Sequence, residues 1–483
     1  MPNAYDRIRY PGQPYGQAHP ALLGAFAHLF GLPYAPFETC RMLEIGCGDG
    51  VNLIGLALAA PEARFVGVDL AEGPIAQARA DALACGCSNV EFLAADLRDI
   101  GPEFGAFDYI VAHGVLAWVP DPVREALFPV IGARLAPHGL AMVSFNALPG
   151  ARAWQAMRDM LQIETKGAGT PEEALARARA FLERNLPLWS KRQADGVWMA
   201  GVARRILDRA PEVLFHDELG AFYAPQLLSD VAAAAAAAGL GYLGDSRPNM
   251  NEEAWFPSEA AAEARARAAG DWTAFQQQLD FLELRSFHNA IFARGLADRR
   301  RDASRLNGLY ARADIREGEP NAAGERVFAV GPARLTTNDP QLASLFETLG
   351  AAYPADSPLD AVRDLEKLES QIYRMFASGV LTLSTAPGPA RRTPGERPFA
   401  SPLARLQAAR GERNLATLTH AVLRIDDAPL QALLLLLDGT RDRATLAFDW
   451  AAAAGLDAGD AREALEGALA TLAQAGVLGG AGS

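Results

Sequence analysis

Short apolar runs alternate with helix-length segments over the first 150 residues of the chain, and this rhythm constrains the fold more than any other feature. The runs of strand length are 41–45, 64–69, 90–94, 107–112 and 139–145. Such alternation is typical of a parallel sheet with helices on both faces. At 483 residues, of which 50% are hydrophobic, the chain is long enough for roughly three domains. We therefore expect a doubly wound, Rossmann-like α/β core followed by further domains.

The alternation of short apolar runs and helix-length segments ends after the fifth run. A charged, helical pattern at 151–212 predicts an insertion into the core. A strand at 213–219, a helix at 225–239 closed by glycine, and an edge strand that begins at Tyr242 are then expected. These elements would complete a first domain at 1–250.

The rest of the chain divides into a helical part and two similar segments. The stretch at 255–315 is helical in pattern and is assigned to a domain at 251–320. The segments at 321–390 and 400–483 each contain helices followed by a short Gly-Val-Leu strand. This similarity predicts two winged-helix-like modules, with a structural or regulatory role because no basic recognition helix is visible.

A glycine-rich loop follows the first predicted strand, where residues 43–50 read Leu-Glu-Ile-Gly-Cys-Gly-Asp-Gly. Glycines between a strand and a helix let the backbone turn tightly and approach a ligand, with helix N–H groups aimed at it. A dinucleotide site would have a further glycine where Val51 stands. The spacing therefore favours the sulfonium cofactor S-adenosylmethionine over a pyrophosphate, and Glu44 or a backbone carbonyl would balance its cationic end.

Acidic residues end the second and third predicted strands. Asp69 is placed to accept hydrogen bonds from both ribose hydroxyls, and Asp96 to meet the exocyclic amine of adenine. Either acid alone could instead cap a helix, but their order at successive strand ends supports the cofactor site. The predicted cofactor-binding residues are Glu44, Gly46, Cys47, Gly48, Gly50, Asn52, Asp69, Leu70, Asp96, Leu97 and His113.

The methyl acceptor is expected at the carboxyl edge of the sheet, which the loops after the fourth and fifth strands reach. Polar groups there would favour the deprotonated form of an amine, and a Trp ring would offer a face to a cation. The alternative is structural: a strand-end histidine, a core tryptophan and tyrosines that fasten the N-terminus. The predicted catalytic residues are His113, Trp118, Asn146, Tyr5, Tyr15 and His19.

Charge and cysteine usage exclude several classes of function. The formal charge of −13 repels nucleic acid, and the densest basic cluster, 299–301, is interpreted as a solvated helix end, so no nucleic-acid partner is expected. The cysteines Cys40, Cys47, Cys85 and Cys87 lack the spacing of a zinc site, so no metal is expected. Free thiols fit a reducing compartment.

No segment of the sequence predicts export or membrane insertion. The first residues carry neither an apolar stretch nor a basic leader, and the alanine run at 232–238 is too short to span a bilayer. We therefore expect a cytoplasmic location without membrane insertion.

These motifs resemble bacterial methyltransferases that carry a methyltransferase regulatory domain, a group that includes rickettsial protein lysine methyltransferases. The resemblance is carried by the segments Tyr5-Asp6, His19-Pro20, 29–32, 43–50 with Asn52, His113-Gly114, 118–120, Asn146 and 148–150. It implies a helical regulatory domain, a winged-helix-like C-terminal part and an active site partly covered by the N-terminal segment. The sequence departs from the family pattern at Leu116, Ala117, Phe145, Ala147 and Ala151.

Three functions stay open at this point. The first is transfer of a methyl group to protein lysine side chains, with a homodimer as the candidate assembly. The second is N- or O-methylation of a small molecule. The third is a non-catalytic interaction protein that responds to S-adenosylmethionine.

Overall fold

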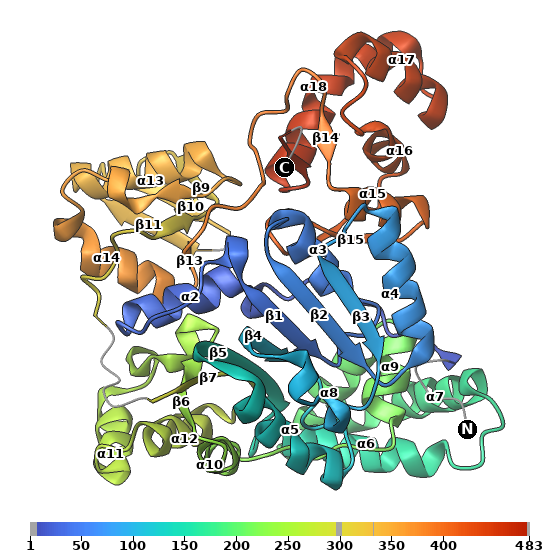
Figure 1. Cartoon of the computed structure of the whole chain (residues 1–483), viewed down its shortest axis with the longest axis vertical. Coiled ribbons are helices and arrows are strands. Elements are labelled where there is room, and N and C mark those ends of the chain that lie inside the picture. The colour runs from blue at the N-terminus through green and yellow to red at the C-terminus, as the bar shows by residue number, and fades with distance from the viewer. Residues whose placement is uncertain (1–6, 296–301, 332, 481–483) are drawn as a thin grey trace.

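A seven-stranded sheet forms the centre of the structure (Figure 1). The computed structural model describes residues 7–295, 302–331 and 333–480. In order across the sheet, the strands are β3 (Val90–Ala94), β2 (Arg64–Asp69), β1 (Arg41–Ile45), β4 (Phe107–Ala112), β5 (Leu135–Asn146), β7 (Phe287–Arg294) and β6 (Leu240–Asp245). Strands β1 to β5 are parallel, whereas β7 is antiparallel to both of its neighbours. The predicted doubly wound core is confirmed, and its strand order reverses between β1 and β4, where such sheets bind ligands.

Helices cover both faces of the sheet. One face carries α2 (Pro20–Leu29), α3 (Val51–Ala59) and α4 (Glu72–Ala84); the other carries α5 (Asp121–Arg134) and α10 (Leu228–Ala237), with α11 (Ser258–Ala268) and α12 (Trp272–Glu283) beyond α10. Successive strand residues point to opposite faces. Met42 and Tyr109 therefore pack into the first apolar core, and Leu43 and Ile110 into the second.

The predicted insertion is a helical layer with a small apolar core of its own. Its helices are α6 (Ala151–Glu164), α7 (Pro171–Ser190), α8 (Asp195–Leu207) and α9 (Pro211–Leu219). The predicted strand at 213–219 is wrong, because this segment is the body of α9. Pro211 occupies the first turn, where a missing N–H costs nothing, and α9 packs against α6 and α7. A short apolar run by itself does not separate a buried strand from a helix.

The helical pattern predicted for 255–315 is only partly correct. Helices α11 and α12 occupy its first half, but 287–294 enters the sheet as β7 between β5 and β6. All but the end residues of β7 are buried, and such a strand lacks the alternation that would reveal it. The edge strand predicted from Tyr242 is confirmed as β6. The sheet thus continues past residue 250, and the divisions at 1–250 and 251–320 stay a prediction.

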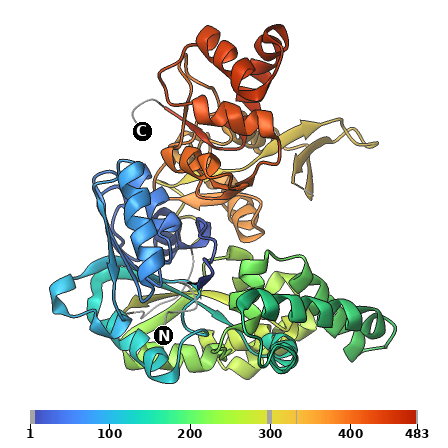
Figure 2. The same ribbon diagram turned by 90° about the vertical axis from the view of Figure 1, so that its right-hand side faces the viewer.

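Two smaller units follow the core (Figures 1 and 2). The first contains β8 (Tyr310–Arg312), β9 (Ile315–Gly318), β10 (Arg326–Val330), β11 (Ala333–Thr337), α13 (Pro340–Ala352), β12 (Ser357–Pro358), α14 (Leu365–Ala377) and β13 (Thr382–Ser384). The second contains β14 (Phe399–Ala400), α15 (Pro402–Ala409), β15 (Asn414–Ala416), β16 (Val422–Arg424), α16 (Ala428–Leu436), α17 (Arg443–Ala454), α18 (Ala458–Gln474) and β17 (Leu478–Gly479). Gly379 and Gly476, with φ of 74° and 75°, lie just beyond α14 and α18 and lead into the Gly-Val-Leu segments. The second unit rests on the core, where α15 contacts α3 and α4.

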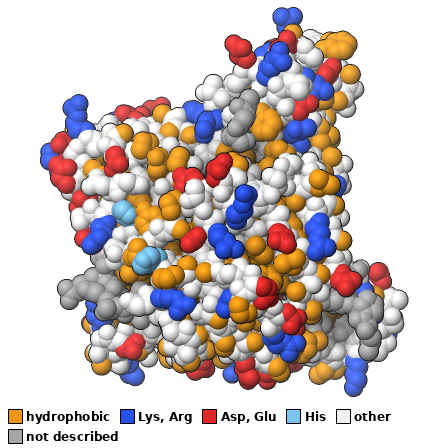
Figure 3. Space-filling model, viewed as in Figure 1, with side chains coloured by type: hydrophobic (Ala, Val, Ile, Leu, Met, Phe, Trp, Pro, Cys, Tyr) orange, Lys and Arg blue, Asp and Glu red, His pale blue; other side chains and the backbone are white. Residues whose placement is uncertain are grey.

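Short 3-10 turns complete the described structure. They are η1 (Gly16–Ala18), η2 (Phe37–Thr39), η3 (Leu97–Asp99), η4 (Pro102–Phe104), η5 (Pro248–Asn251), η6 (Glu253–Trp255) and η7 (Leu359–Ala361). Of the helices in the described ranges, none combines the length and apolar character that a membrane crossing requires. Acidic and basic side chains are interspersed on the face shown in Figure 3. The basic cluster at 299–301 lies outside the described residues.

Candidate active site

A cavity of about 960 Å³ opens at the carboxyl ends of the parallel strands. Its walls come from the ends of β1 to β5, the N-terminal segment, and the insertion helices α6, α8 and α9. The predicted site residues that line it are Glu44, Gly46, Cys47, Gly48, Asn52, Asp69, Leu70, Asp96, Leu97, His113, Trp118, Asn146 and Tyr15. Residues predicted from loops far apart in the sequence thus meet around one space.

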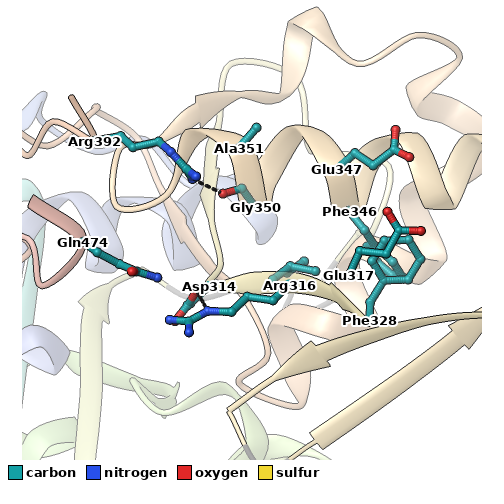
Figure 4. A pocket seen from close by; sticks show the side chains of 11 residues that line it. Asp314, Arg316, Glu317, Phe328, Phe346, Glu347, Gly350, Ala351, Arg392 and Gln474 are labelled. Carbon is teal, nitrogen blue, oxygen red and sulfur yellow. Dashed lines mark hydrogen bonds and ion pairs between the residues drawn. The ribbon is translucent and has the colours of Figure 1, made fainter. Parts of the chain in front are cut away.

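A second cavity of about 490 Å³ lies between β9 and α13 (Figure 4). Its charged side chains are already engaged: Arg316 pairs with Asp314 at 2.9 Å, and Arg392 donates to the carbonyl of Gly350 at 2.6 Å. It contains none of the predicted residues. The large cavity is therefore the candidate active site.

The glycines of the 43–50 loop serve two purposes. A Cβ on Gly50 would lie 2.5 Å from the ring of Phe92, so Gly50 permits packing beneath the loop and does not line the cavity. Gly48 has a φ of 54°, in the left-handed region, and a Cβ at this position would meet no described atom within 4 Å. The open space at Gly48 faces the cavity and leaves room for a ligand against the backbone.

The carboxylate of Asp69 is oriented by two backbone amides. Gly48 N donates to Oδ2 at 3.0 Å and Ala71 N donates to Oδ1 at 2.9 Å. A carboxylate accepts more than one bond per oxygen, so both oxygens can still accept ribose hydroxyls. Hydrogen bonds from Arg98 lower the pKa of Asp96, which caps η3 and also lines the cavity. Asp96 is thus a helix cap and a candidate adenine contact at once.

Glu44 has a buried carboxyl group, and one of its two oxygens is hydrogen-bonded within the protein. Asn52 Nδ2 donates to Oε1 at 3.1 Å, whereas Oε2 has no hydrogen-bond partner among the described residues. Burial raises the pKa of Glu44 to about 8. A buried carboxyl with a free oxygen in a cavity is suited to meet a cation, because a cation would offset its desolvation.

We expect cofactor binding to release a proton from Glu44 near neutral pH. With a pKa of about 8, Glu44 is mostly protonated at pH 7 in the empty site, and a bound cation favours the carboxylate. Affinity for S-adenosylmethionine should therefore rise with pH, by at most about 10-fold per unit, and level off above pH 8. Calorimetric titration in two buffers of different ionisation enthalpy measures the released proton. Glu44→Gln should remove both effects, and wild-type binding without proton release would contradict this assignment.

The N-terminal segment at 7–19 lies across this loop. Arg9 Nε and Nη2 donate to Asp49 Oδ2 at 3.0 and 2.8 Å, and Gly12 N donates to the same oxygen at 3.2 Å. Tyr15 N donates to Asn52 Oδ1 at 2.9 Å. The segment therefore covers the cofactor end of the cavity, as the family resemblance implies. Neither Arg9 nor Asp49 was predicted as a site residue. Asp49 lies within the 43–50 motif, but its contact with Arg9 spans 40 positions, and no local pattern reveals such a contact.

His113 forms part of the wall between the two ends of the cavity. Its ring stacks on Tyr15, with centroids 3.9 Å apart and an interplanar angle of 23°. Burial, with a smaller effect of Arg247, lowers the pKa of His113 to about 4. The imidazole is therefore neutral at pH 7 and can contact the cofactor or the acceptor without adding charge.

The other end of the cavity combines aromatic and charged side chains from the loop after β4, from α6 and from the segment after α9. Trp118 and Tyr223 lie 5.0 Å apart, and the guanidinium of Arg158 lies 5.3 and 4.6 Å from their ring centroids. A cation of the protein thus already occupies the ring face that was expected to receive the substrate. Asn146 Oδ1 is buried with no hydrogen-bond partner among the described residues.

An acidic pair on α9 was missed from the sequence. Asp217 Oδ2 and Glu218 Oε1 accept from Arg209 Nη1 at 2.9 and 3.2 Å. Burial raises the pKa of both carboxyl groups, that of Glu218 to about 7. Asp217 lines the cavity. The acidic pair was not predicted because 213–219 was interpreted as a strand of the sheet.

One predicted catalytic residue of the described part of the chain, His19, does not line the cavity. His19 caps α2 by accepting from Ala21 N at 3.1 Å, and its ring packs against that of Phe37, with centroids 4.6 Å apart. His19 therefore caps a helix, and we correct its placement in the site. Tyr5 lies outside the described residues.

Comparison with known proteins gives the family. The sequence matches the profiles of a methyltransferase domain at 42–139, a predicted methyltransferase regulatory domain at 210–294 and the C-terminal winged-helix domain of PKMT at 396–454. It is 31% identical over 218 residues to RP028 of Rickettsia prowazekii, a match that spans 45% of this chain and 87% of RP028. The chain belongs to the methyltransferases that carry a regulatory domain. The predicted cofactor, S-adenosylmethionine, is confirmed with the family.

Other similarities differ in their extent. RP789 of R. prowazekii is 39% identical over 181 residues, which cover 38% of this chain but only 33% of RP789. The chain thus spans about a third of that relative. The structure of PKMT2 from Rickettsia typhi in complex with AdoHcy superposes with a TM-score of 0.88 at 23% identity, over 98% of this chain and all of PKMT2. This likeness shows that nearly all of the chain shares the PKMT2 fold, and the family match at 396–454 assigns the winged-helix domain.

Proposed function

We propose that the protein transfers the methyl group of S-adenosylmethionine to the side-chain amine of lysine residues in a protein substrate. The observation that carries the proposal is the second end of the cavity, which is walled by aromatic rings and open at its rim. Trp198, Phe222 and Leu284 line the cavity and are 46%, 48% and 57% exposed. An exposed apolar rim is suited to the flanks of a macromolecular acceptor. The shared fold of PKMT2 supports the same substrate class.

The residues of the cofactor half of the cavity support a role for each part of S-adenosylmethionine. We assign Asp69 to the ribose, Asp96 and Leu97 to the adenine, and Glu44 to the cationic end, with Gly48 leaving the space between them. When bound, the cofactor supplies an activated methyl group to a nucleophile in line with the sulfur–carbon bond, so alignment provides most of the catalysis. The protein has to hold the two reactants and control one proton.

The acceptor amine has to lose a proton before it can attack, and the charged groups around the acceptor end favour this loss. A lysine amine has an ordinary pKa of about 10.4 and attacks only when neutral. Arg205 and Arg209 line the cavity and disfavour an additional cation there. Asp217, whose pKa burial raises, is placed to accept the proton that the ammonium loses. Asn146 Oδ1, unpaired among the described residues, can accept a hydrogen bond from the amine.

Most of the residues that depart from the family pattern do not line the cavity. Leu116, Ala117, Phe145 and Ala147 are buried and do not line the cavity. Ala151 alone of the five contributes to the cavity wall. The altered residues therefore leave the aromatic and charged groups of the acceptor end in place.

Partition of a labelled methyl group tests the proposal against the alternatives. The protein is incubated with labelled S-adenosylmethionine and cell lysate, and label is measured separately in protein and in small molecules. We expect label in protein, lost in Asp69→Ala. Label confined to small molecules would favour a small-molecule methyltransferase, and cofactor binding without label in either fraction would favour a non-catalytic role. A homodimer, a cytoplasmic location and the lack of a nucleic-acid partner also remain proposals.

A further inference from the structure

The turn between β15 and β16 of the C-terminal unit reaches α3 of the core, which follows the glycine-rich loop at 43–50. His420 lies in this turn, buried, with its Nε2 2.8 Å from Asn52 Oδ1 across 368 positions of sequence. Its ring also lies beside Gly55 of α3, 3.4 Å from where a Cβ would stand. His420 has a φ of 57°, a conformation that non-glycine residues adopt at a cost. This strained backbone conformation places the imidazole against α3.

The imidazole of His420 is neutral and acts as a hydrogen-bond donor. Burial, together with Arg312, lowers the pKa of His420 to about 3. The other titratable ring beside it, His19, is 5.3 Å away and also has a lowered pKa. Asn52 Oδ1 only accepts, so the ring proton must be on Nε2.

The side chain of Asn52 forms hydrogen bonds with three parts of the chain: the N-terminal segment, β1, and the turn between β15 and β16. Its Oδ1 accepts from His420 Nε2 and from Tyr15 N, so two donors fix which side of the amide carries the oxygen. Its Nδ2 then points to Glu44 and donates to Oε1 at 3.1 Å. The hydrogen bond from Asn52 lowers the pKa of Glu44, against the effects of burial, Asp69 and Asp49.

We infer that His420 is a positioning residue of the cofactor site: through Asn52 it holds the Glu44 carboxyl and the N-terminal segment in the geometry that binds S-adenosylmethionine. The winged-helix unit then completes the cofactor site and is more than an appended module. The inference rests on the proposed assignment of Glu44 to the cationic end of the cofactor.

Replacement of His420 in the full chain tests the inference. His420→Gly removes the donor and suits the left-handed backbone, so it tests the side chain with little backbone strain. We expect the dissociation constant for S-adenosylmethionine to rise about 10-fold, as for the loss of a hydrogen bond in a charged network. The pH of half-maximal binding should also move upward, because a loosened Asn52 lowers the pKa of Glu44 less. His420→Gln, whose amide nitrogen can donate from a similar position, should recover most of the affinity.

A second contact at the same interface provides the control. Arg410 Nη1 donates to Asp81 Oδ2 of α4 at 2.7 Å, and neither residue lines the cavity. Arg410→Ala should lower the melting temperature but leave the pH of half-maximal binding unchanged. The inference is overturned if His420→Gly binds with wild-type affinity and pH dependence, or if Arg410→Ala shifts that pH equally. Failure of wild-type protein to bind the cofactor would instead refute the proposed function.

Discussion

Gly48→Arg is expected to abolish binding of S-adenosylmethionine while the protein remains folded. No described atom lies within 4 Å of a Cβ at this position, so the new side chain finds room without displacing the core. That room is the space assigned to the cofactor. We expect affinity to fall by more than about 100-fold, since the ligand and the side chain compete for the same volume. Isothermal titration of the purified variant measures this directly.

Gly86→Arg is the matched control for this variant. Gly86 follows α4, has a φ of 77° and likewise offers open space for a Cβ, but it does not line the cavity. Both variants carry the same cost of roughly 1–2 kcal/mol for a left-handed arginine. Equal cofactor affinity in the two variants would show that Gly48 does not face the cofactor.

Asp217→Asn should separate cofactor binding from methyl transfer. The amide keeps the shape of the side chain but cannot take the proton of an ammonium acceptor. We expect kcat/KM to fall by about 100-fold or more, the usual loss for a general base. The dissociation constant for S-adenosylmethionine should stay within about 2-fold of wild type, because Asp217 belongs to the other end of the cavity.

Controls for Asp217→Asn come from its own helix and from pH. Glu212→Gln changes an exposed carboxyl in the first turn of α9 and should behave as wild type. If Asp217 is the proton acceptor, its removal also flattens the rise of kcat/KM with pH on the acidic side. An Asp217→Asn enzyme with wild-type kcat/KM and pH profile would remove Asp217 from the mechanism.

The cofactor half of the site could be predicted because its signals are local. Asp69 ends β2 and Gly48 lies in the loop after β1, and the carboxyl ends of parallel strands meet at one edge of the sheet. Once the strands were placed, the spacing of these residues determined where they would gather. The predicted limits of β1 to β4 agree with the observed strands for the same reason.

The acceptor half and its supports could not be predicted in this way. Arg158 bonds to the carbonyl of Gly220 62 positions away, and His420 reaches Asn52 across 368 positions. Such contacts depend on how the insertion and the winged-helix unit dock, and no periodicity in the sequence encodes that docking. Asp217 was missed because α9 is short and reads equally well as a strand.

Peptide mass spectrometry after reaction with methyl-labelled S-adenosylmethionine tests the central claim most directly. Acceptor proteins from the lysate are digested, and the labelled residue is identified from its fragments. The proposed function predicts label on lysine side-chain nitrogen in the wild-type reaction and none with Gly48→Arg. Label on carboxyl or hydroxyl oxygen, or wild-type protein that binds the cofactor yet labels no peptide, would contradict it.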